Sequence, residues 1–461
     1  MRLRDYLTTV VRGRSISGRP RLRWVVLLVI FVPVAGVSCA ATAPALLQSS
    51  GKGCLSEGGR QGCTPGRALS SASWITITPD GRNVYVGAEA SGAINIYQRV
   101  GPFGGLIQPD GSAGCLSESA LEGCGSARAL TGARPVAVSP DGRSVYVGAL
   151  NGVAVFLRDR GSGALVQLPG PAGCVENGAA EGCGAARGFA KGSVRGLAVS
   201  ADGRFVYAAV RFTSVVAVFA RDPNSGAISQ LPGGAGCISE TRRPGCAWGR
   251  GLHGSRDVVL SPDQRFVYIA SEDGNSVAVF ARNRRTGTLI QLRGRSGCLQ
   301  QRGNDGCTPV RAFLSPHQLA LSRNGLDAYV ASDHSAAVDV LRRDPGNGTL
   351  HQLAGRAGCV EDGGGEGCTP GSALGAAHSI AVAPSGLVYV AGNSANSVAI
   401  FAVDSRTAGL RERGCIASRG PPECARAFGL MGVHSITLSS DGRTLYAASE
   451  RGDAIVVLTV G

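Results

Sequence analysis

Arginine and histidine residues recur at one position of a repeating pattern in this sequence, at intervals of 56 to 61 residues. Together with one tryptophan they form a set of seven: Trp74, Arg134, Arg195, Arg256, His317, His378 and His434. An arginine guanidinium can bind a carboxylate or a phosphate through two parallel hydrogen bonds. Histidine titrates near neutral pH and can take up or release a proton. If the fold brings the seven side chains together, they suit a small anionic ligand.

A second set of polar residues could act beside the first. Each follows the second apolar run of a repeat, which places it in a loop: Glu89, Asn151, Glu272, Asp273, Asp333, His334, Asn393 and Glu450. Any of the carboxylates could serve as a general base, although most loop acids are only solvated. Of these residues we select Glu272 as a ligand-binding candidate. The sequence has no G-x-S-x-G nucleophile elbow, no phosphate-binding glycine loop and no zinc-protease helix.

Fourteen of the 15 cysteines form seven pairs with eight residues between the partners. The pairs are Cys54 with Cys63, Cys115 with Cys124, Cys174 with Cys183, Cys237 with Cys246, Cys298 with Cys307, Cys359 with Cys368, and Cys415 with Cys424. Two cysteines separated by a short glycine-rich loop most simply form a local disulfide in an oxidising compartment. A zinc site needs four ligands, and each loop offers only two. We therefore predict seven disulfides, no metal and no cofactor.

A column of arginines follows the second cysteine of most pairs: Arg67, Arg128, Arg187, Arg250, Arg311 and Arg426, with Ser372 in place of one member. Acidic residues such as Glu118, Glu176, Glu240 and Glu361 occur in the same loops. Because oppositely charged side chains are close in sequence, we expect structural ion pairs that fix these loops.

The cysteine pairs mark a repeat of about 60 residues that fills the chain after the leader. Each repeat holds an apolar run that ends in a turn (VAVSPDG, 136–142), a second run (VYVGA, 145–149), an alternating third run (SVAVFAR, 276–282) and a short fourth run (GTLIQL, 287–292). Four short runs of period two predict a four-stranded antiparallel sheet. Seven such sheets bury both faces by packing radially, so the sequence predicts an all-β, seven-bladed β-propeller.

The seventh repeat lacks its fourth strand, because the chain stops at Gly461. A matching segment occurs before the first cysteine: ALLQSSGKGC at 45–54 resembles TLIQLRGRSGC at 288–298. We therefore predict that this N-terminal strand completes the last blade and closes the ring. The domain would cover residues 44–461.

In a propeller the first strand of each blade is innermost, so the Trp/Arg/His set should line the mouth of the central channel. Three interpretations remain open at this point. The set could bind a ligand, it could fill the channel and bond to backbone carbonyls, or its three histidines could hold a metal ion. Order around the ring does not decide between an enzyme and a binding scaffold, because three arginines are followed by three histidines.

The core SPDGRSVYV (Ser139–Val147), echoed at Thr78–Val86, resembles YVTN-type β-propeller repeats. More broadly the chain resembles the seven-bladed lactonase-like family, which includes 6-phosphogluconolactonase-type and carboxymuconate-cyclising enzymes. The cysteine-bounded insert departs from that family. The resemblance implies chemistry at the channel mouth, with arginine stabilising an oxyanion and histidine moving a proton. The catalytic candidates are His317, His378, His434, Arg195 and Arg256, and the ligand-binding candidates are Trp74, Arg134 and Glu272.

Residues 1–43 have the pattern of a secretory signal, with seven arginines, a charge-free apolar run (24–37) and then small residues. Cleavage near Ala40 or Ala41, lipidation at Cys39 and retention as a single membrane anchor are all compatible with it. Each outcome places the rest of the chain outside the cytoplasm.

The net charge of +14 falls to +8 without the leader, and no basic run interleaved with aromatic residues remains. We therefore expect no nucleic-acid binding. Two classes of function are left. One is a monomeric binding scaffold, secreted or on the cell surface, for a small anion or for an extracellular protein or cell-wall partner. The other is a lactonase-like hydrolase acting on a small anionic lactone.

Overall fold

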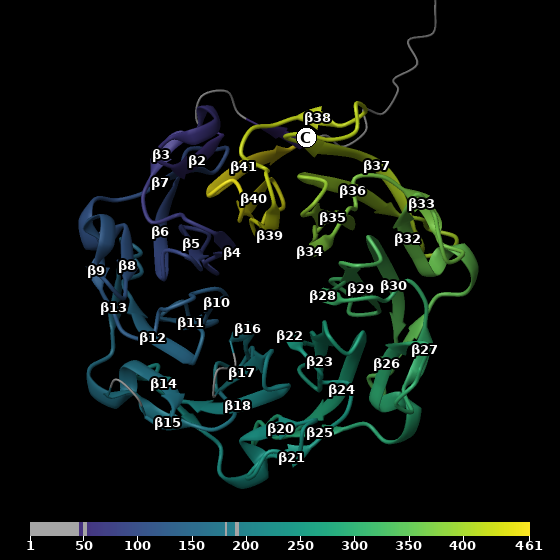
Figure 1. Ribbon diagram of the computed structural model, residues 1–461, viewed down its shortest axis with the longest axis horizontal. Helices are drawn as coiled ribbons and strands as arrows, with labels where there is room; N and C mark the ends of the chain where they lie inside the picture. Colours follow the sequence, from purple (N-terminus) through teal and green to yellow (C-terminus); the bar gives the residue numbers. More distant parts are fainter. Residues whose placement is uncertain (1–45, 49–52, 180–181, 190–192) are drawn as a thin grey trace, which may run out of the picture. The chain divides into compact units, whose positions relative to one another are not determined.

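The structure is a computed structural model that describes residues 46–48, 53–179, 182–189 and 193–461. In these residues seven β-sheets surround a central axis, and each innermost strand packs against the next (Figure 1). The innermost strands are β4 (Ala72–Ile77), β10 (Val136–Val138), β16 (Val194–Val199), β22 (Ser255–Leu260), β28 (Pro316–Leu321), β34 (Ala377–Val382) and β39 (Val433–Leu438). The predicted seven-bladed β-propeller is confirmed. The predictions for residues 1–43, including Cys39, lie outside the described residues.

Two further antiparallel strands complete the inner part of each blade. The second strands are β5 (Asn83–Ala88), β11 (Ser144–Gly148), β17 (Phe205–Val210), β23 (Phe266–Ser271), β29 (Asp327–Ser332), β35 (Leu387–Gly392) and β40 (Thr444–Ser449). The third strands are β6 (Ala93–Val100), β12 (Gly152–Arg158), β18 (Val215–Arg221), β24 (Ser276–Arg282), β30 (Ala337–Arg343), β36 (Ser397–Val403) and β41 (Ala454–Val460). All six residues of β23 are buried, because neighbouring blades cover both faces of the sheet.

The outer part of each blade is more elaborate than the sequence predicts. In the fourth blade β25 (Leu289–Gln291) pairs with one half of β24, and β26 (Cys298–Gln301) pairs with the other half. A 3₁₀ turn, η7 (Gly294–Gly297), separates the two segments. The chain after the second cysteine then returns as β27 (Thr308–Val310), parallel to β26. The segment that follows the cysteine loop thus adds an edge strand to the blade.

The same arrangement recurs around the ring. The segments equivalent to β25 are β7 (Gly105–Ile107), β13 (Leu165–Gln167), β19 (Ile228–Gln230) and β31 (Leu350–Gln352). Those equivalent to β26 are β2 (Cys54–Glu57), β8 (Cys115–Ser117), β14 (Cys174–Asn177), β20 (Cys237–Ser239) and β32 (Cys359–Asp362), and β37 (Leu410–Ala417) spans both in the sixth blade. The parallel edge strands are β3 (Thr64–Gly66), β9 (Gly125–Ser126), β15 (Gly184–Ala186), β21 (Ala247–Trp248), β33 (Thr369–Gly371) and β38 (Ala425–Arg426).

All seven predicted disulfides are present, so the pairing predicted from the cysteine spacing is confirmed. They join Cys54 to Cys63, Cys115 to Cys124, Cys174 to Cys183, Cys237 to Cys246, Cys298 to Cys307, Cys359 to Cys368, and Cys415 to Cys424. Their Cα–Cα distances are 4.7 to 4.9 Å. Disulfides in such number are typical of an extracytoplasmic protein. Among the described residues, no helix is long and apolar enough to cross a membrane.

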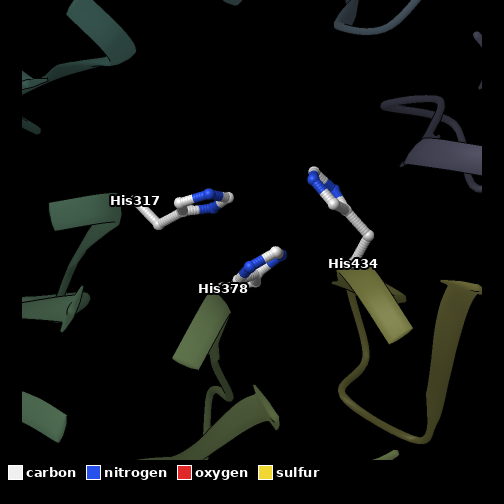
Figure 2. Close-up of side chains that lie close together, drawn as sticks. All are labelled: His317, His378 and His434. Atoms are coloured by element: carbon white, nitrogen blue, oxygen red, sulfur yellow. The ribbon is translucent and has the colours of Figure 1, made fainter. Parts of the chain in front are cut away.

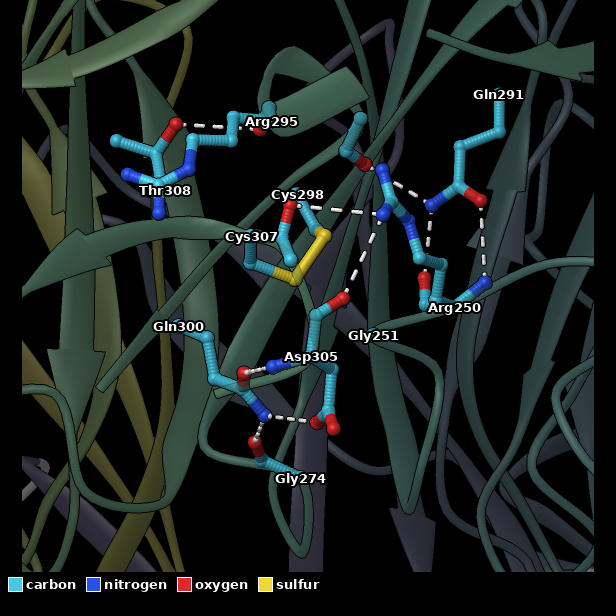
Figure 3. The surroundings of a disulfide bond; sticks show 12 residues. Arg250, Gly251, Gly274, Gln291, Arg295, Cys298, Gln300, Asp305, Cys307 and Thr308 are labelled. Carbon is cyan, nitrogen blue, oxygen red and sulfur yellow. Dashed lines mark hydrogen bonds between the residues drawn. A yellow bond between two sulfur atoms is a disulfide. The ribbon is translucent and has the colours of Figure 1, made fainter. Parts of the chain in front are cut away.

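Each disulfide closes a loop that has hydrogen bonds of its own, as Figure 3 shows for the bond between Cys298 and Cys307. Inside this loop the Gln300 side chain accepts a hydrogen bond from the backbone N–H of Asp305 and donates one to its carboxylate. The disulfide and these two bonds together fix the loop at the edge of the blade.

The expectation that the arginines after the second cysteines form ion pairs with loop acids is wrong for Arg250. Its guanidinium donates to the backbone oxygens of Gly294 and Asp305 instead. The nearby Glu240 accepts hydrogen bonds from the backbone N–H groups of Gly251 and Leu252. Backbone groups that the sheet leaves free must find partners, and these charged side chains supply them.

The predicted ring closure is confirmed. Strand β1 (Leu46–Gln48) pairs antiparallel with β41, and β2 pairs with the other half of β41. Leu46 lies opposite Val460 and is buried in the core of the last two blades. The Gln48 side chain also exchanges two hydrogen bonds with the backbone of Phe428. The first and last parts of the described chain therefore share one blade.

A buried arginine joins each of several blades to the blade before it. The Arg158 side chain, which is fully buried, ends β12 and donates to both carboxylate oxygens of Asp80 in the turn between β4 and β5. It also donates to the Tyr85 hydroxyl, and that hydroxyl donates to the backbone oxygen of Gly163. The Asp and Tyr of the repeated PDG-x-x-VY motif thus serve contacts between blades.

The arginine–aspartate contact occurs at four of the seven junctions, and at a fifth the arginine bonds the tyrosine only. At the other two junctions both the arginine and the aspartate are replaced. Arg221, Arg282 and Arg343 bond the turn aspartates Asp141, Asp202 and Asp263, and Arg99 bonds Tyr446 across the closing junction. In the sixth and seventh blades the arginine position holds Val403 and Val460. The preceding turns then hold Asn324 and Ser385 instead of aspartate. An aspartate without the arginine would leave a partly buried charge unpaired.

Candidate active site

A β-bulge presents most of the ring residues to the channel. The pairing of the first and second strands shifts register on either side of Arg195, Arg256, His317, His378 and His434. A bulged residue is left out of the ladder and its side chain is redirected. Arg134 lies just before β10 and donates its backbone N–H to Gly148. The predicted ring is therefore brought together at one end of the channel.

Trp74 occupies a different register from the other six members. In the first blade the shift spans Ala72 and Trp74, so the bulged residue is Ser73. The turn motif supports this alignment, because Trp74 is six residues before Asp80 whereas Arg195 is seven residues before Asp202. Trp74 still borders the cavity, from the position after the bulge.

The residues after the bulges hold neighbouring innermost strands together. The Asp257 carboxylate accepts the backbone N–H of Leu319 in the next blade, at 3.0 Å. Gln318 and Ser379 make the equivalent contacts one and two blades further on. Burial raises the pKa of Asp257 to about 6, although its two backbone hydrogen bonds oppose the shift. These bonds fix the strands that carry the ring.

Three imidazole rings converge at the channel mouth (Figure 2). His317 and His378 are stacked with their centroids 3.8 Å apart, and the His434 ring stands at 84° to His378 at 4.8 Å. Burial lowers the pKa of His317 and of His434 well below the usual value, and the neighbouring positive groups lower it further. Burial also lowers the pKa of His378. All three rings are therefore neutral at pH 7.

The contacts of His434 determine its tautomer. Its Nδ1 lies 2.7 Å from the backbone oxygen of Ser73, which can only accept a hydrogen bond. Its Nε2 lies 3.3 Å from Arg134 and 3.1 Å from Arg256, and guanidinium groups can only donate. The proton is therefore on Nδ1, and Nε2 presents a lone pair to the ring.

Acidic residues of the loops neutralise the arginines of the ring. Arg256 lies 2.8 Å from Glu272, which is also 3.2 Å from Arg211. Arg134 contacts Glu89 and lies 3.4 Å from Glu450. The loop acids that were predicted to lie beside the ring therefore contact its arginines. The sequence prediction did not include Arg211, because the corresponding loop positions of most other blades hold an acid or an asparagine.

Arg195 is the least engaged of the three ring arginines. Its only ion pair among the described residues is with Glu89, at 3.6 Å. Its buried Nε has no hydrogen-bond partner in the described part of the chain. Burial lowers the pKa of Arg195 to about 10, so the guanidinium remains charged at pH 7. This N–H group is a hydrogen-bond donor without an acceptor in the described part of the chain.

The space between the ring residues is small. A cavity of about 10 Å³ lies among the seven ring residues together with Gln318, Ser379 and Ser435. This is room for about one water molecule. Beyond the ring the channel widens to about 530 Å³ between the innermost strands, where Ile75, Leu197 and Leu438 are among the lining residues. A ligand larger than water therefore has to contact the ring from one of its two sides.

The comparison with known proteins decides the family. The family model described as lactonase, seven-bladed β-propeller, matches residues 116–298 and 309–461. The chain belongs to this lactonase family. Among curated proteins, none matches the sequence.

Solved structures of other proteins share the architecture of this lactonase-family chain. A candidate 6-phosphogluconolactonase from Bacteroides fragilis is 17% identical, with 74% of this chain and 82% of that chain covered and a TM-score of 0.53. Hydrazine synthase from Kuenenia stuttgartiensis is 14% identical, with 85% and 96% covered and a TM-score of 0.54. At these identities the likeness concerns the fold alone.

Proposed function

We propose that the protein hydrolyses a small lactone at the channel mouth, outside the cytoplasm. The observation that carries the proposal is the neutral His434, whose Nε2 lone pair faces a water-sized space that Arg195 also lines. A hydrolase needs a base, a water and an oxyanion donor in one place. Membership of the lactonase family supports this reaction class.

The reaction can be followed atom by atom. A water in the cavity replaces the guanidinium groups at Nε2 of His434, and that nitrogen takes a proton as the water oxygen attacks the lactone carbonyl. Negative charge then develops on the carbonyl oxygen, where the free Nε–H of Arg195 stabilises it. The bond between the carbonyl carbon and the ring oxygen breaks, and the leaving oxygen receives the proton from His434. The product is a hydroxy acid.

The other predicted residues support this arrangement. Arg256, held by Glu272, and Arg134, held by Glu89 and Glu450, donate to the attacking water or to an acidic group of the substrate. His317 and His378 pack beside His434 and restrict its ring. Trp74 covers part of the cavity wall.

The test is hydrolysis of five- and six-membered lactones, with and without a carboxylate or phosphate, by the oxidised protein. We expect turnover of at least one acidic lactone, and a loss of about 10²- to 10⁴-fold in kcat/KM for His434→Asn and for Arg195→Ala. His351→Ala, at an exposed histidine of β31, serves as the control and should be unchanged. Absence of turnover with every lactone, or full activity of His434→Asn, would contradict the proposal.

A binding scaffold is the second candidate, favoured by one observation. Arg134, Arg195 and Arg256 each contact a carboxylate already, and the ring leaves little space. An extracellular protein or a cell-wall polymer would then bind the loops rather than the channel. Co-sedimentation with isolated cell walls tests this function, and no binding of any lactone or small anion in thermal-shift measurements would favour it.

A further inference from the structure

We propose that an open groove between the third and fourth blades binds a chain of phosphate groups. The groove has a volume of about 800 Å³ and is lined by Asp202, Asn283 and five arginines. This inference goes beyond hydrolysis at the channel mouth, and binding to the groove can be measured without any lactone.

The groove lies at the far ends of the innermost strands from the ring. Arg256 is at the start of β22, whereas Arg265 is in the turn between the end of β22 and the start of β23. Arg195 and Arg204 are placed in the same way about β16. A ligand in the groove therefore binds on the other side of the propeller from the channel mouth.

The groove carries more positive charge than the equivalent positions at neighbouring junctions. Its charged residues give a net charge of +4 and are Asp202, Arg204, Arg265, Arg282, Arg284 and Arg285. Between the second and third blades the equivalent positions hold three arginines and two aspartates, a net charge of +1. Between the fourth and fifth blades they hold two of each and no net charge. A local surplus of this kind attracts anions.

Asn283 keeps the shape of its turn without the charge that this position usually has. In the second blade the equivalent Asp159 accepts hydrogen bonds from two backbone N–H groups of its turn. Asn283 accepts the equivalent bonds from Arg285 and Thr286. Three other blades have an aspartate at this position: Asp222, Asp344 and Asp404. Because an amide oxygen accepts the same bonds without a negative charge, Arg284 and Arg285 have no carboxylate in their own turn.

Two of the arginines are held in place by stacking. The guanidinium carbon of Arg204 lies 5.6 Å from the ring centroid of Phe205, and that of Arg265 lies 5.4 Å from the ring centroid of Phe266. Both phenylalanines are buried, so the guanidinium groups rest on the fixed core of the blades. An asparagine, a serine or a threonine follows the equivalent Arg82, Arg143 and Arg443. Preorganised side chains lose less conformational entropy when a ligand binds.

The exposed arginines of the groove have no acidic partners. Among the described residues, no ion pair involves Arg204, Arg265, Arg284 or Arg285. The side chains of Arg204 and Arg265 donate hydrogen bonds to backbone oxygens only. Of the described residues that line the groove, Asp202 is the only carboxylate. Most of the positive charge is therefore not neutralised by the protein.

The donors and the size of the groove indicate the class of ligand. A guanidinium binds a phosphate through two parallel hydrogen bonds, and arginines from both blades can share its tetrahedral oxygens. A groove of about 800 Å³ has room for several such groups in a row. Proteins that bind single-stranded nucleic acid stack the bases on aromatic side chains, and none of the described residues lining this groove is aromatic. The ligand is therefore a chain of phosphate groups without bases, either inorganic polyphosphate or a polymer linked by phosphodiesters.

The experiment is titration of the oxidised protein by calorimetry, at low and at physiological salt, with inorganic polyphosphate and with poly(glycerol phosphate). We expect binding of at least one of them that weakens as salt screens the exposed charges. The probe that binds more tightly identifies the source of the phosphate groups. Each unit of charge should change the affinity about fivefold. Arg284→Ala/Arg285→Ala should therefore weaken binding about 25-fold, and Asn283→Asp about fivefold.

A matched control and two further ligands keep the test decisive. Arg160 is the exposed equivalent of Arg284 in the second blade, so Arg160→Ala should bind normally. Circular dichroism shows that each variant is folded. Unchanged affinity in both groove variants, or an equal loss in Arg160→Ala, would overturn the groove as the site.

The class of ligand is tested in the same way. Tighter binding of polyglutamate or of oligothymidylate than of either phosphate probe would overturn the choice of a phosphate chain without bases. Failure of both phosphate probes to bind at low salt would overturn the proposal as a whole. A failure of lactone hydrolysis concerns only the channel mouth, so the two proposals fail separately.

Discussion

The buried arginine between blades allows a quantitative test of how the ring is held together. In Arg158→Val, Asp80 and Tyr85 lose the guanidinium to which both are bonded. Breaking a buried ion pair from one side costs about 3 to 5 kcal/mol. The Asp80 side chain is 20% exposed and keeps some solvation, so we expect Arg158→Val to lower the free energy of unfolding by the smaller of these amounts, about 3 kcal/mol. Asp80→Ser should cost a similar amount, because it leaves the fully buried Arg158 charge unpaired.

The double variant Asp80→Ser/Arg158→Val reproduces the pair that the chain itself uses at Ser385 and Val460. It removes both charges together, so its cost should fall below the sum of the single variants by about 2 kcal/mol. Guanidinium unfolding of the oxidised protein, followed by circular dichroism, measures all three. Arg160→Val, at an exposed arginine two residues away, is the control. Additive costs, or single costs below about 1 kcal/mol, would refute the reasoning.

Three further predictions concern stability. The pKa of His317, His378 and His434 is lowered in the folded protein, so below the ordinary pKa of 6.5 the unfolded chain binds more protons than the folded chain. The free energy of unfolding should therefore decrease as the pH is lowered, by at most about 1.4 kcal/mol per pH unit for each histidine. Scanning calorimetry between pH 7 and 5 should show a shallower decrease in His434→Asn. Replacing Cys298 and Cys307 with serine should cost about 2 to 3 kcal/mol, and an unchanged unfolding midpoint would contradict this. Leu46→Ala should cost about 2 to 5 kcal/mol because β1 closes the ring, whereas Leu47→Ala, at a 58% exposed side chain, should be neutral in the same denaturation assay.

Much of the fold can be predicted from local patterns in the sequence. The seven repeats, the cysteine pairing and the completion of the last blade by residues near Leu46 depend on spacing and on alternation of apolar residues, which the chain displays directly. The same periodicity predicted the channel-mouth position of all seven ring residues. The spacing did not show that Trp74 borders the cavity from the position after the bulge, because the bulged residue of the first blade is Ser73.

Contacts between distant residues depend on the tertiary structure. The spacing of Arg158 and Asp80 contains no sign of their pairing, although the joint loss at Val403 and Asn324 could have revealed it. The sequence predicted an anion-binding ring of arginines, and only the folded chain brings Glu89, Glu272 and Glu450 against them. The sequence alone therefore determined the architecture and the residue types at the channel mouth. Their charge balance, the tautomer of His434 and the space left for a ligand were decided by packing, because each depends on distances between blades.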